Sequence, residues 1–287
     1  QTDISRNRDL FFISLIIIVP IFLISIQPDP GSAIIFLAFL FPIFREGLNV
    51  NFLYHLFIII VVFFLTLTIG IYITIFLVSI IYTLFILYQS RKKRKIKFLK
   101  FIFTIILYFS IILSTNYVFE NVLEQRHRDR INIITGKDFD TKGIGYNINQ
   151  SKIAIGSGGF SGIGFLKGTQ TKGDFVPKQH TDYIFSTVGE EWGFIGSSFL
   201  IFLFSYLIIR IITRAEKQQI HHKRIFCNCF ASLLFIHFFI NIGMSLGILP
   251  TIGIPLPFVS YGGSSLLSFS VMFFIYLNYD SSRLKES

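Results

Sequence analysis

A carboxylate at the border between a polar loop and an apolar segment is the first group in this sequence that could do chemistry. Asp182 lies within the polar stretch Lys172–Gly193 and is followed at once by the sequence Tyr-Ile-Phe. An ionisable group at the mouth of a membrane span is costly to desolvate, so by default it indicates a functional site. One positioned carboxylate can act as the general base that removes a proton from a hydroxyl group. The structural alternative is a helix cap, in which Thr181 or Asp182 accepts the first unpaired N–H groups of the following helix.

Basic side chains in the preceding loop suggest a site for an anion. They could form a rim that holds a phosphate-bearing ligand at the bilayer surface, whereas the alternative is a solvated loop with scattered charges. The glycine-rich segment Gly156–Gly168 either forms a close-packed loop or lines an anion site with backbone N–H groups. It lacks the strand and helix context of a nucleotide-binding fingerprint. The basic residues are Arg126, Arg128, Arg130, Lys152, Lys167, Lys172 and Lys178.

Further polar groups fall inside apolar segments. Glu190 and Glu191 follow Asp182 within the next apolar helix, where two carboxylates must face a protein interior or water. We expect at least one of them to be a structural partner within the helix bundle. The sequence PLPFVSYGGSS at 255–265 predicts a broken helix, which a membrane tolerates only against protein or a water-filled cavity. Cys227 and Cys229 have no partner at ligand spacing, so neither a disulfide framework nor a zinc site is indicated.

The composition indicates a polytopic helical membrane protein. Of 287 residues, 52% are apolar and 36 are Phe, and the mean hydropathy is +0.65. A helix needs about 20 residues to cross the ~30 Å hydrocarbon core, so the run at 52–88 is too long for one crossing and Gly70 divides it into a hairpin. The predicted fold class is all-α, with about eight transmembrane helices and one long extracytoplasmic loop. The predicted spans are residues 10–26, 31–44, 52–69, 71–88, 98–119, 185–209, 225–246 and 263–279.

The net charge of +10 carries information about topology. Alternation of the spans places both ends of the chain inside, together with 17 of the 26 Lys and Arg residues. The other nine lie in one long loop at 120–182, which the positive-inside rule exempts because long loops translocate largely regardless of charge. The basic residues form rows beside the membrane rather than an aromatic-interleaved patch, which argues against nucleic-acid binding.

Several motifs, in this order and spacing, resemble one family: the shape, elongation, division and sporulation (SEDS) proteins, which are polytopic peptidoglycan glycosyltransferases. The resemblance covers most of the chain and is strongest to the elongation members. Two positions depart from the usual family pattern, Pro30 in place of Leu and Lys178 in place of Glu, and about four family spans are expected before Gln1. The matching motifs are QPDPG (27–31), RDRI (128–131), QSKIAIGSGGFSGIGFLKGTQT (150–171), FVPKQHTDYIF (175–185), GEEWGFIG (189–196), NIGM (241–244) and GILPTIGIPLPFVSYGGSS (247–265).

The resemblance implies a reaction and a site. The family's essential carboxylate falls on Asp182, and its loop lysine falls on Lys172. The implied activity is the polymerisation of lipid II into glycan strands during cell-wall elongation and rod-shape maintenance, with Asp182 as the general base for the acceptor hydroxyl. Residues assigned to substrate binding are Lys172, Lys152, Arg128, Arg130, His180, Ser260, Gly262 and Gly263.

The resemblance also implies an organisation and partners. We expect a single membrane domain at 1–287 with an inserted helical hairpin at 52–88 and an extracytoplasmic catalytic loop at 120–184. The protein would lie in the bacterial cytoplasmic membrane, with its active site on the outer face. Its partners would be a class B penicillin-binding protein transpeptidase and membrane proteins of the elongation machinery. A divalent cation, Mg²⁺ or Mn²⁺, could assist the diphosphate, with its ligands unassigned. The competing hypothesis is a flippase for lipid-linked precursors.

Overall fold

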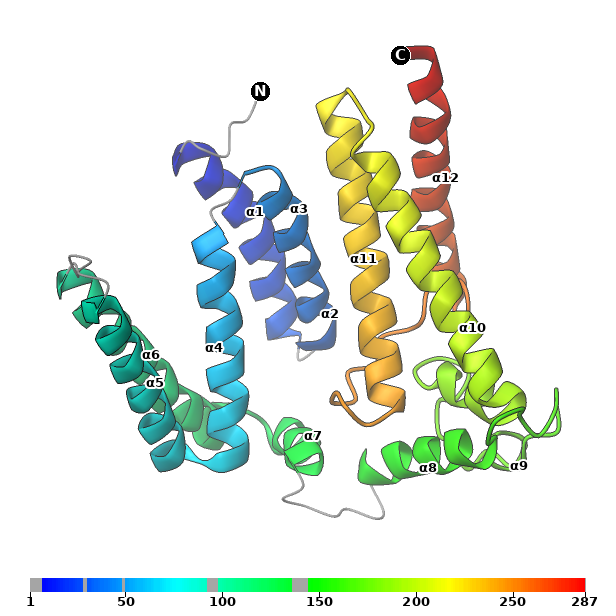
Figure 1. Ribbon diagram of the computed structural model, residues 1–287. Helices are drawn as coiled ribbons and strands as arrows, with labels where there is room; N and C mark the ends of the chain where they lie inside the picture. Colours follow the sequence, from blue (N-terminus) through cyan, green and yellow to red (C-terminus); the bar gives the residue numbers. More distant parts are fainter. Residues whose placement is uncertain (1–6, 28–29, 48–49, 92–97, 136–143, 287) are drawn as a thin grey trace. The chain divides into compact units, whose positions relative to one another are not determined.

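The computed structural model is helical throughout most of the part of the chain that it describes, residues 7–27, 30–47, 50–91, 98–135 and 144–286 (Figure 1). The chain forms two compact units. The larger unit comprises Gln1–Leu48 and Phe139–Ser287, and the smaller unit comprises Asn49–Asp138.

Three long helices form the centre of the larger unit: α10 (Ile184–Ala215), α11 (His221–Ser245) and α12 (Gly263–Glu286). Their sequences are apolar on all sides, as expected for helices that face lipid or protein around their whole circumference. They share a core in which Ile211, Phe230 and Tyr276 are almost completely buried. Three shorter elements pack against α11, namely α2 (Pro30–Ile35), the 3₁₀ turn η1 (Phe36–Phe39) and α3 (Leu40–Arg45). Helix α1 (Asn7–Ile26) packs against α2 and η1.

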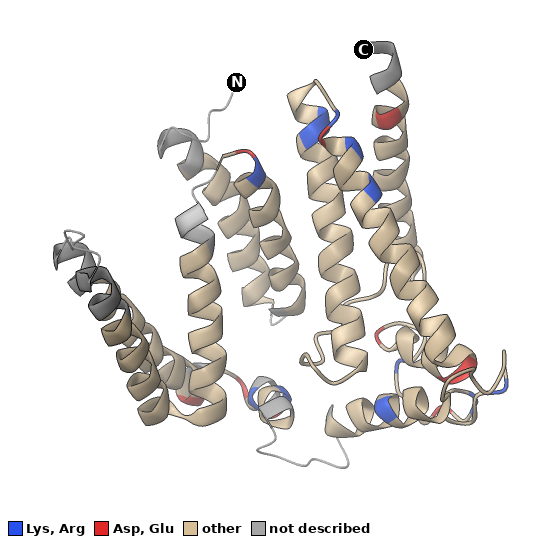
Figure 2. Ribbon diagram, viewed as in Figure 1, with Lys and Arg blue, Asp and Glu red and all other residues tan. Residues whose placement is uncertain are grey.

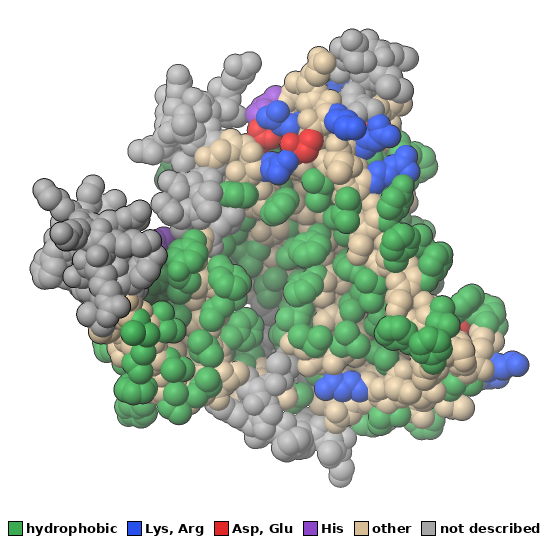
Figure 3. Space-filling model, in the orientation of Figure 1, with side chains coloured by type: hydrophobic (Ala, Val, Ile, Leu, Met, Phe, Trp, Pro, Cys, Tyr) green, Lys and Arg blue, Asp and Glu red, His purple; other side chains and the backbone are tan. Residues whose placement is uncertain are grey.

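Ion pairs join these shorter helices to one end of the long ones. Arg45 Nε donates to Glu216 Oε1 at 2.7 Å, and Arg224 donates to both carboxylate oxygens of Glu46 at 3.0 and 2.8 Å. The hydrogen bond from Arg45 lowers the pKa of the Glu216 carboxyl below its usual value. Charged residues therefore gather at this end of the unit, while the middle of α10 and α11 is apolar (Figures 2 and 3).

The smaller unit begins with a helical hairpin. Its first helix, α4 (Val50–Ile69), is followed by Gly70 with φ +93°, and then by α5 (Ile71–Arg91). The break at Gly70 is therefore where the sequence predicts it, in a conformation that glycine adopts without steric cost. Both helices pack on α6 (Phe98–Tyr117), and His55 Nδ1 of α4 lies 2.9 Å from the Tyr108 hydroxyl of α6. The unit ends with the π-helical turn η2 (Val118–Val122) and α7 (Gln125–Thr135).

Several described helices are long and apolar enough to cross a membrane. Three segments meet that length and composition: Phe103–Asn121, Ile184–Ala215 and His221–Ser245. Shorter apolar helical segments occur at Phe11–Ile26, Gly31–Arg45, Tyr54–Ile69 and Ile71–Leu84. The structure thus agrees with a polytopic helical membrane protein, and the count of eight spans stays a prediction. The span predicted at 31–44 is not one regular helix, because the 3₁₀ turn η1 interrupts it between α2 and α3.

Candidate active site

An amphipathic helix, α8 (Ile144–Ser157), lies across the ends of α10 and α11 (Figure 1). Ile148 and Ala154 are buried, whereas Lys152 is exposed. Ser151, also buried, donates its hydroxyl to the carbonyl of Ser245 at 2.8 Å, the last residue of α11. Helix α8 thus forms a platform at the ends of the long helices, on which the following loop is built.

Helix α10 is broken near its start, and the glycine-rich loop forms hydrogen bonds with the backbone on both sides of the break. Gly193 has φ 63° and ψ −157°, outside the helical region, so backbone groups on either side of it lose their helical partners. The loop supplies replacements. The hydrogen bonds run from Ile163 N to Glu190 O (3.0 Å), from Gly164 N to Glu191 O (3.0 Å), from Phe194 N to Gly159 O (2.9 Å) and from Ile195 N to Phe160 O (3.2 Å).

Close packing between this loop and α10 explains the glycines. A Cβ atom on Gly158 would overlap the carbonyl oxygen of Gly189, and one on Gly162 would overlap that of Glu191. A Cβ on Gly193 would in turn overlap the backbone nitrogen of Gly162. Of the two interpretations of the glycine-rich segment, the close-packed loop is therefore confirmed.

Asp182 lies in the turn that leads into α10, with 17% of its side chain exposed. The N-cap residue of α10 is Tyr183, and no side chain makes a capping hydrogen bond there, so the capping alternative for Asp182 is wrong. The turn is built on Lys178, which has φ +56° and whose carbonyl oxygen accepts the N–H groups of Thr181, Asp182 and Tyr183. The Lys178 ammonium lies 3.9 Å from Asp182 Oδ2.

Three consecutive carbonyl groups hold the backbone at Asp182 in place. Tyr261 N donates to the carbonyl of His180 at 2.8 Å, and the Ser260 hydroxyl donates to that of Thr181 at 2.6 Å. The carbonyl of Asp182 accepts the side-chain amide of Asn241 at 2.9 Å. These donors come from α11 and from the non-helical segment before α12, so two elements distant in sequence fix one short stretch of backbone.

The same segment brings further groups towards the carboxylate. The Asn241 amide also donates to the carbonyl of Ile254 at 2.8 Å, which ties the non-helical segment to α11. Gly253 has φ +85°, and a Cβ built on it would lie 3.5 Å from Asp182 Oδ2. The predicted break in the helix after α11 is therefore present and packs against the candidate base.

Lys172 is the exposed last residue of a short helix, α9 (Thr169–Lys172). Gln179 connects this helix to the turn of Asp182. Its buried amide donates to the carbonyl of Thr171 at 2.6 Å and to Asp174 Oδ1 at 2.9 Å. The two residues that the family resemblance singles out are thus held by one hydrogen-bonded loop.

The other predicted binding residues fall into three groups. The imidazole of His180 is exposed beside Asp182, and the stem of Lys152 packs against Gly247, where a Cβ would overlap it. Gly262 and Gly263 precede and begin α12, and a Cβ on Gly263 would meet nothing within 4 Å. Arg128 and Arg130 belong to α7 of the smaller unit, where Arg128 donates to the carbonyl of Glu120 at 3.0 Å.

Sequence reasoning missed some positioning groups. The sequence suggests substrate binding for Ser260, yet its hydroxyl donates to Thr181 O and accepts Leu256 N at 2.8 Å. Asn241 and Gln179 carry no role in the sequence interpretation. Asn241 is a polar residue within an apolar helix, and that is the signal that could have identified it. Across the described ranges, no three His, Cys, Asp or Glu side chains come together as a metal site.

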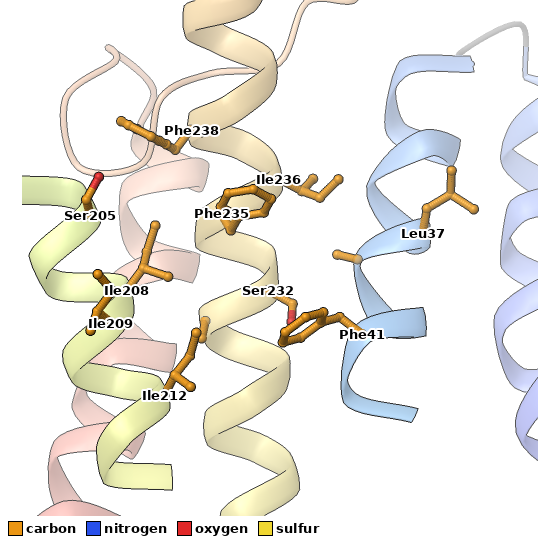
Figure 4. A pocket seen from close by; sticks show the side chains of 12 residues that line it. Leu37, Phe41, Ser205, Ile208, Ile209, Ile212, Ser232, Phe235, Ile236 and Phe238 are labelled. Carbon is orange, nitrogen blue, oxygen red and sulfur yellow. The ribbon is translucent and has the colours of Figure 1, made fainter. Parts of the chain in front are cut away.

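An apolar cavity of about 520 Å³ opens elsewhere in the larger unit (Figure 4). Side chains of η1 and α3 face those of α10 and α11 across it, including Phe41, Ile209 and Phe235. Among the described residues that line it, only Ser205 and Ser232 have polar side chains, so they offer no titratable group for proton transfer.

The chain belongs to the FtsW/RodA/SpoVE family of cell cycle proteins, whose sequence profile matches residues 72–285. The predicted SEDS membership is therefore confirmed. Among particular relatives, peptidoglycan glycosyltransferase MrdB of Escherichia coli K12 is 41% identical over 162 residues, which cover 56% of this chain and 44% of the relative. Peptidoglycan glycosyltransferase RodA of Treponema pallidum is 40% identical over 146 residues, covering 50% and 34%. The chain thus spans less than half the length of these relatives.

A likeness to a solved structure extends over the whole chain. The match covers 99% of this chain and 65% of the other, with a TM-score of 0.65 and 24% sequence identity. That structure is described as showing the structural coordination of polymerization and crosslinking by a peptidoglycan synthase complex. At this identity, the match shows that the two chains share a fold.

Proposed function

We propose that this chain carries the catalytic carboxylate of a peptidoglycan glycosyltransferase that polymerises lipid II. The names of its relatives support this activity. The proposal rests on the contrast between the backbone and the side chain of Asp182. Its backbone carbonyl is held by Asn241 of α11. Among the described residues, its carboxylate makes no hydrogen bond and only the 3.9 Å ion pair with Lys178. A carboxylate that is held in place but not used by the fold is available to accept a proton.

In the proposed reaction, Asp182 acts as the general base. It removes the proton from the 4-hydroxyl of the acceptor GlcNAc, and the oxygen attacks the anomeric carbon of the donor MurNAc. The bond from that carbon to the diphosphate breaks, and polyprenyl diphosphate leaves with its electron pair. Attack opposite the leaving group inverts the configuration, as in inverting glycosidases, which likewise use a carboxylate base.

Cations are required because the diphosphate leaves as an anion. Lys172 and Lys152 are both exposed in the larger unit, and their ammonium groups suit this role. Mg²⁺ binds through one or two carboxylates together with substrate phosphates. Since the described residues assemble no ligand cluster, such an ion would depend on the diphosphate for most of its ligands.

The finer assignments follow from sequence likeness. We infer a role in cell-wall elongation, at the outer face of the bacterial cytoplasmic membrane. The structural relative comes from a complex described as coordinating polymerization and crosslinking. From the family resemblance, we propose a class B penicillin-binding protein transpeptidase as the partner, which would supply the crosslinking activity that this description names.

Purified protein in lipid vesicles tests the proposal. With lipid II and the partner transpeptidase, we expect glycan chains that gel electrophoresis resolves as a ladder. A parallel assay follows translocation of a labelled lipid-linked precursor across the same vesicles. Translocation without glycan would contradict the polymerase and favour the flippase hypothesis.

A further inference from the structure

Glu190 is a fully buried carboxylate that the proposed reaction does not use. It lies on α10, ahead of the break at Gly193, and its exposed fraction is 0%. Burying a charged carboxylate in a membrane protein is costly unless hydrogen bonds compensate for lost water. The Glu190 carboxylate therefore needs hydrogen-bond donors close by.

The partners all belong to the short helix α9. Glu190 Oε1 accepts the backbone N–H of Gln170 at 2.7 Å, and Oε2 accepts that of Thr171 at 2.8 Å. The hydroxyl of Thr169 donates to Oε1 at 3.3 Å. Helix α9 has only four residues and too few internal hydrogen bonds to be stable alone. Glu190 supplies acceptors for N–H groups that have no partner within the helix.

The backbone packs closely around this contact. A Cβ on Gly168 would overlap Thr171 Oγ1 and would lie 2.7 Å from Glu190 Oε2. At the other end of α9, Gln179 holds the carbonyl of Thr171 and continues into the turn of Asp182. The backbone of Thr171 is therefore held by two buried side chains, Glu190 at its N–H and Gln179 at its carbonyl, and Lys172 follows it directly.

We propose that Glu190 is a positioning residue for Lys172: by holding the first turn of α9, it presents the Lys172 ammonium to the diphosphate of the lipid-linked donor. This inference rests on the proposed function. Glu190 itself touches no substrate. Its effect should therefore appear in donor recognition and should pass through Lys172.

A double-mutant cycle tests this dependence. The variants are Glu190→Gln, Lys172→Ala and the combination, with Glu191→Gln as the matched control. Glutamine keeps the volume but turns an amide N–H₂ towards the N–H groups of α9. We expect Glu190→Gln to lower kcat/KM for lipid II roughly tenfold, mainly through KM, because hydrogen bonds to a charged group are lost. In the Lys172→Ala background the same change should cost less than about twofold.

Other outcomes would overturn the inference. Full additivity with Lys172→Ala would show that Glu190 serves the fold in general, as would an equal effect of Glu191→Gln. If Glu190→Gln does not fold, Glu190→Asp takes its place, and wild-type KM in that variant would contradict the inference. Hydrogen exchange at 168–173 provides a second readout: Glu190→Gln should accelerate it, and unchanged exchange would contradict the contact.

A binding measurement separates this inference from the proposed function. Binding of undecaprenyl diphosphate to the wild type is compared with its binding to Glu190→Gln. If the wild type binds the diphosphate but makes no glycan, the proposed function fails. The positioning role is still supported in that case if Glu190→Gln weakens diphosphate binding in the wild-type background but has no effect on it in the Lys172→Ala background. If Glu190→Gln binds as the wild type does, the positioning role fails, whatever the glycan assay shows.

Discussion

At the scale of single residues, the groups that hold the backbone are distinct from the carboxylate that we propose as the base. Asn241 and Ser260 donate their hydrogen bonds to the carbonyls of Asp182 and Thr181. The carboxylate of Asp182 is left beside Lys178 and Gly253. A base must be held close to its working geometry, since small displacements cost much of the rate. The surrounding hydrogen bonds are therefore expected to matter for turnover as well as for stability.

Ser260→Ala tests the holding role. The substitution removes the donor to Thr181 O and the acceptor for Leu256 N, leaving two backbone groups unpaired. We expect a loss of about 1–3 kcal/mol in the free energy of unfolding and a lower kcat. Thermal unfolding in detergent and glycan synthesis measure the two effects. Ser264→Ala, at an exposed position on α12, is the control and should change neither. Wild-type stability and turnover in Ser260→Ala would contradict the role.

The sequence points to the residues that we propose for the chemistry more directly than to those that position them. Asp182 carries its own signal, because a carboxylate beside an apolar segment is unusual, whereas Lys172 was singled out by the family resemblance. Asn241 acts on a carbonyl 59 positions away, and no local pattern reports such a contact. Ser260 was predicted in the right region but for a different task, because a hydroxyl in a broken helix serves substrate or backbone equally well.

At the scale of elements, the loop at 158–164 and the start of α10 form one structure. The sequence predicts a span at 185–209, and the helix is present as Ile184–Ala215. Its break at Gly193 could not be predicted from hydropathy, because hydropathy does not report backbone conformation and the helix continues on both sides of the break. Only the loop's hydrogen bonds to both sides of the break make this conformation acceptable. Gly70, in contrast, was predictable from length, since 52–88 exceeds one crossing.

Two glycine substitutions test whether the packing of the loop against α10 contributes to stability. Gly162 has φ +82°, and a Cβ there would overlap the carbonyl oxygen of Glu191. Gly162→Ala should therefore lower the free energy of unfolding by more than about 1 kcal/mol. A Cβ on Gly156, in helix α8, would meet nothing within 4 Å, so Gly156→Ala should be neutral or slightly stabilising. Equal melting temperatures for both variants would show that the loop does not hold α10.

At the scale of the whole molecule, the distribution of charge predicts an orientation in the membrane. The part of α10 after the break at Gly193 runs to Ala215, 22 residues or about 33 Å at 1.5 Å per residue, which is enough to cross the ~30 Å hydrocarbon core. Asp182 precedes one end, and Arg214 and Glu216 lie at the other. Composition was sufficient to predict the helical membrane class. The number of crossings was not decided by composition, because several apolar helices are shorter than a full span.

Cysteine labelling tests the orientation. In a chain carrying Cys227→Ala and Cys229→Ala, single cysteines replace Ser161 and Lys217, which are both exposed in the larger unit. A membrane-impermeant maleimide applied to intact cells should modify Ser161→Cys and spare Lys217→Cys, because basic connections stay inside. Permeabilised cells should label both positions. Labelling of Lys217→Cys alone in intact cells would place Asp182 on the inner face, away from the proposed substrate.

The most direct test of the central claim is glycan synthesis by Asp182→Asn. Asparagine keeps the volume and leaves the backbone carbonyl available to Asn241, but its side chain cannot accept a proton at neutral pH. We predict that the rate of lipid II polymerisation falls about 10²- to 10⁴-fold, while the melting temperature and lipid II binding stay close to wild type. Long glycan chains made by Asp182→Asn at a near wild-type rate would contradict the assignment of Asp182 as the base.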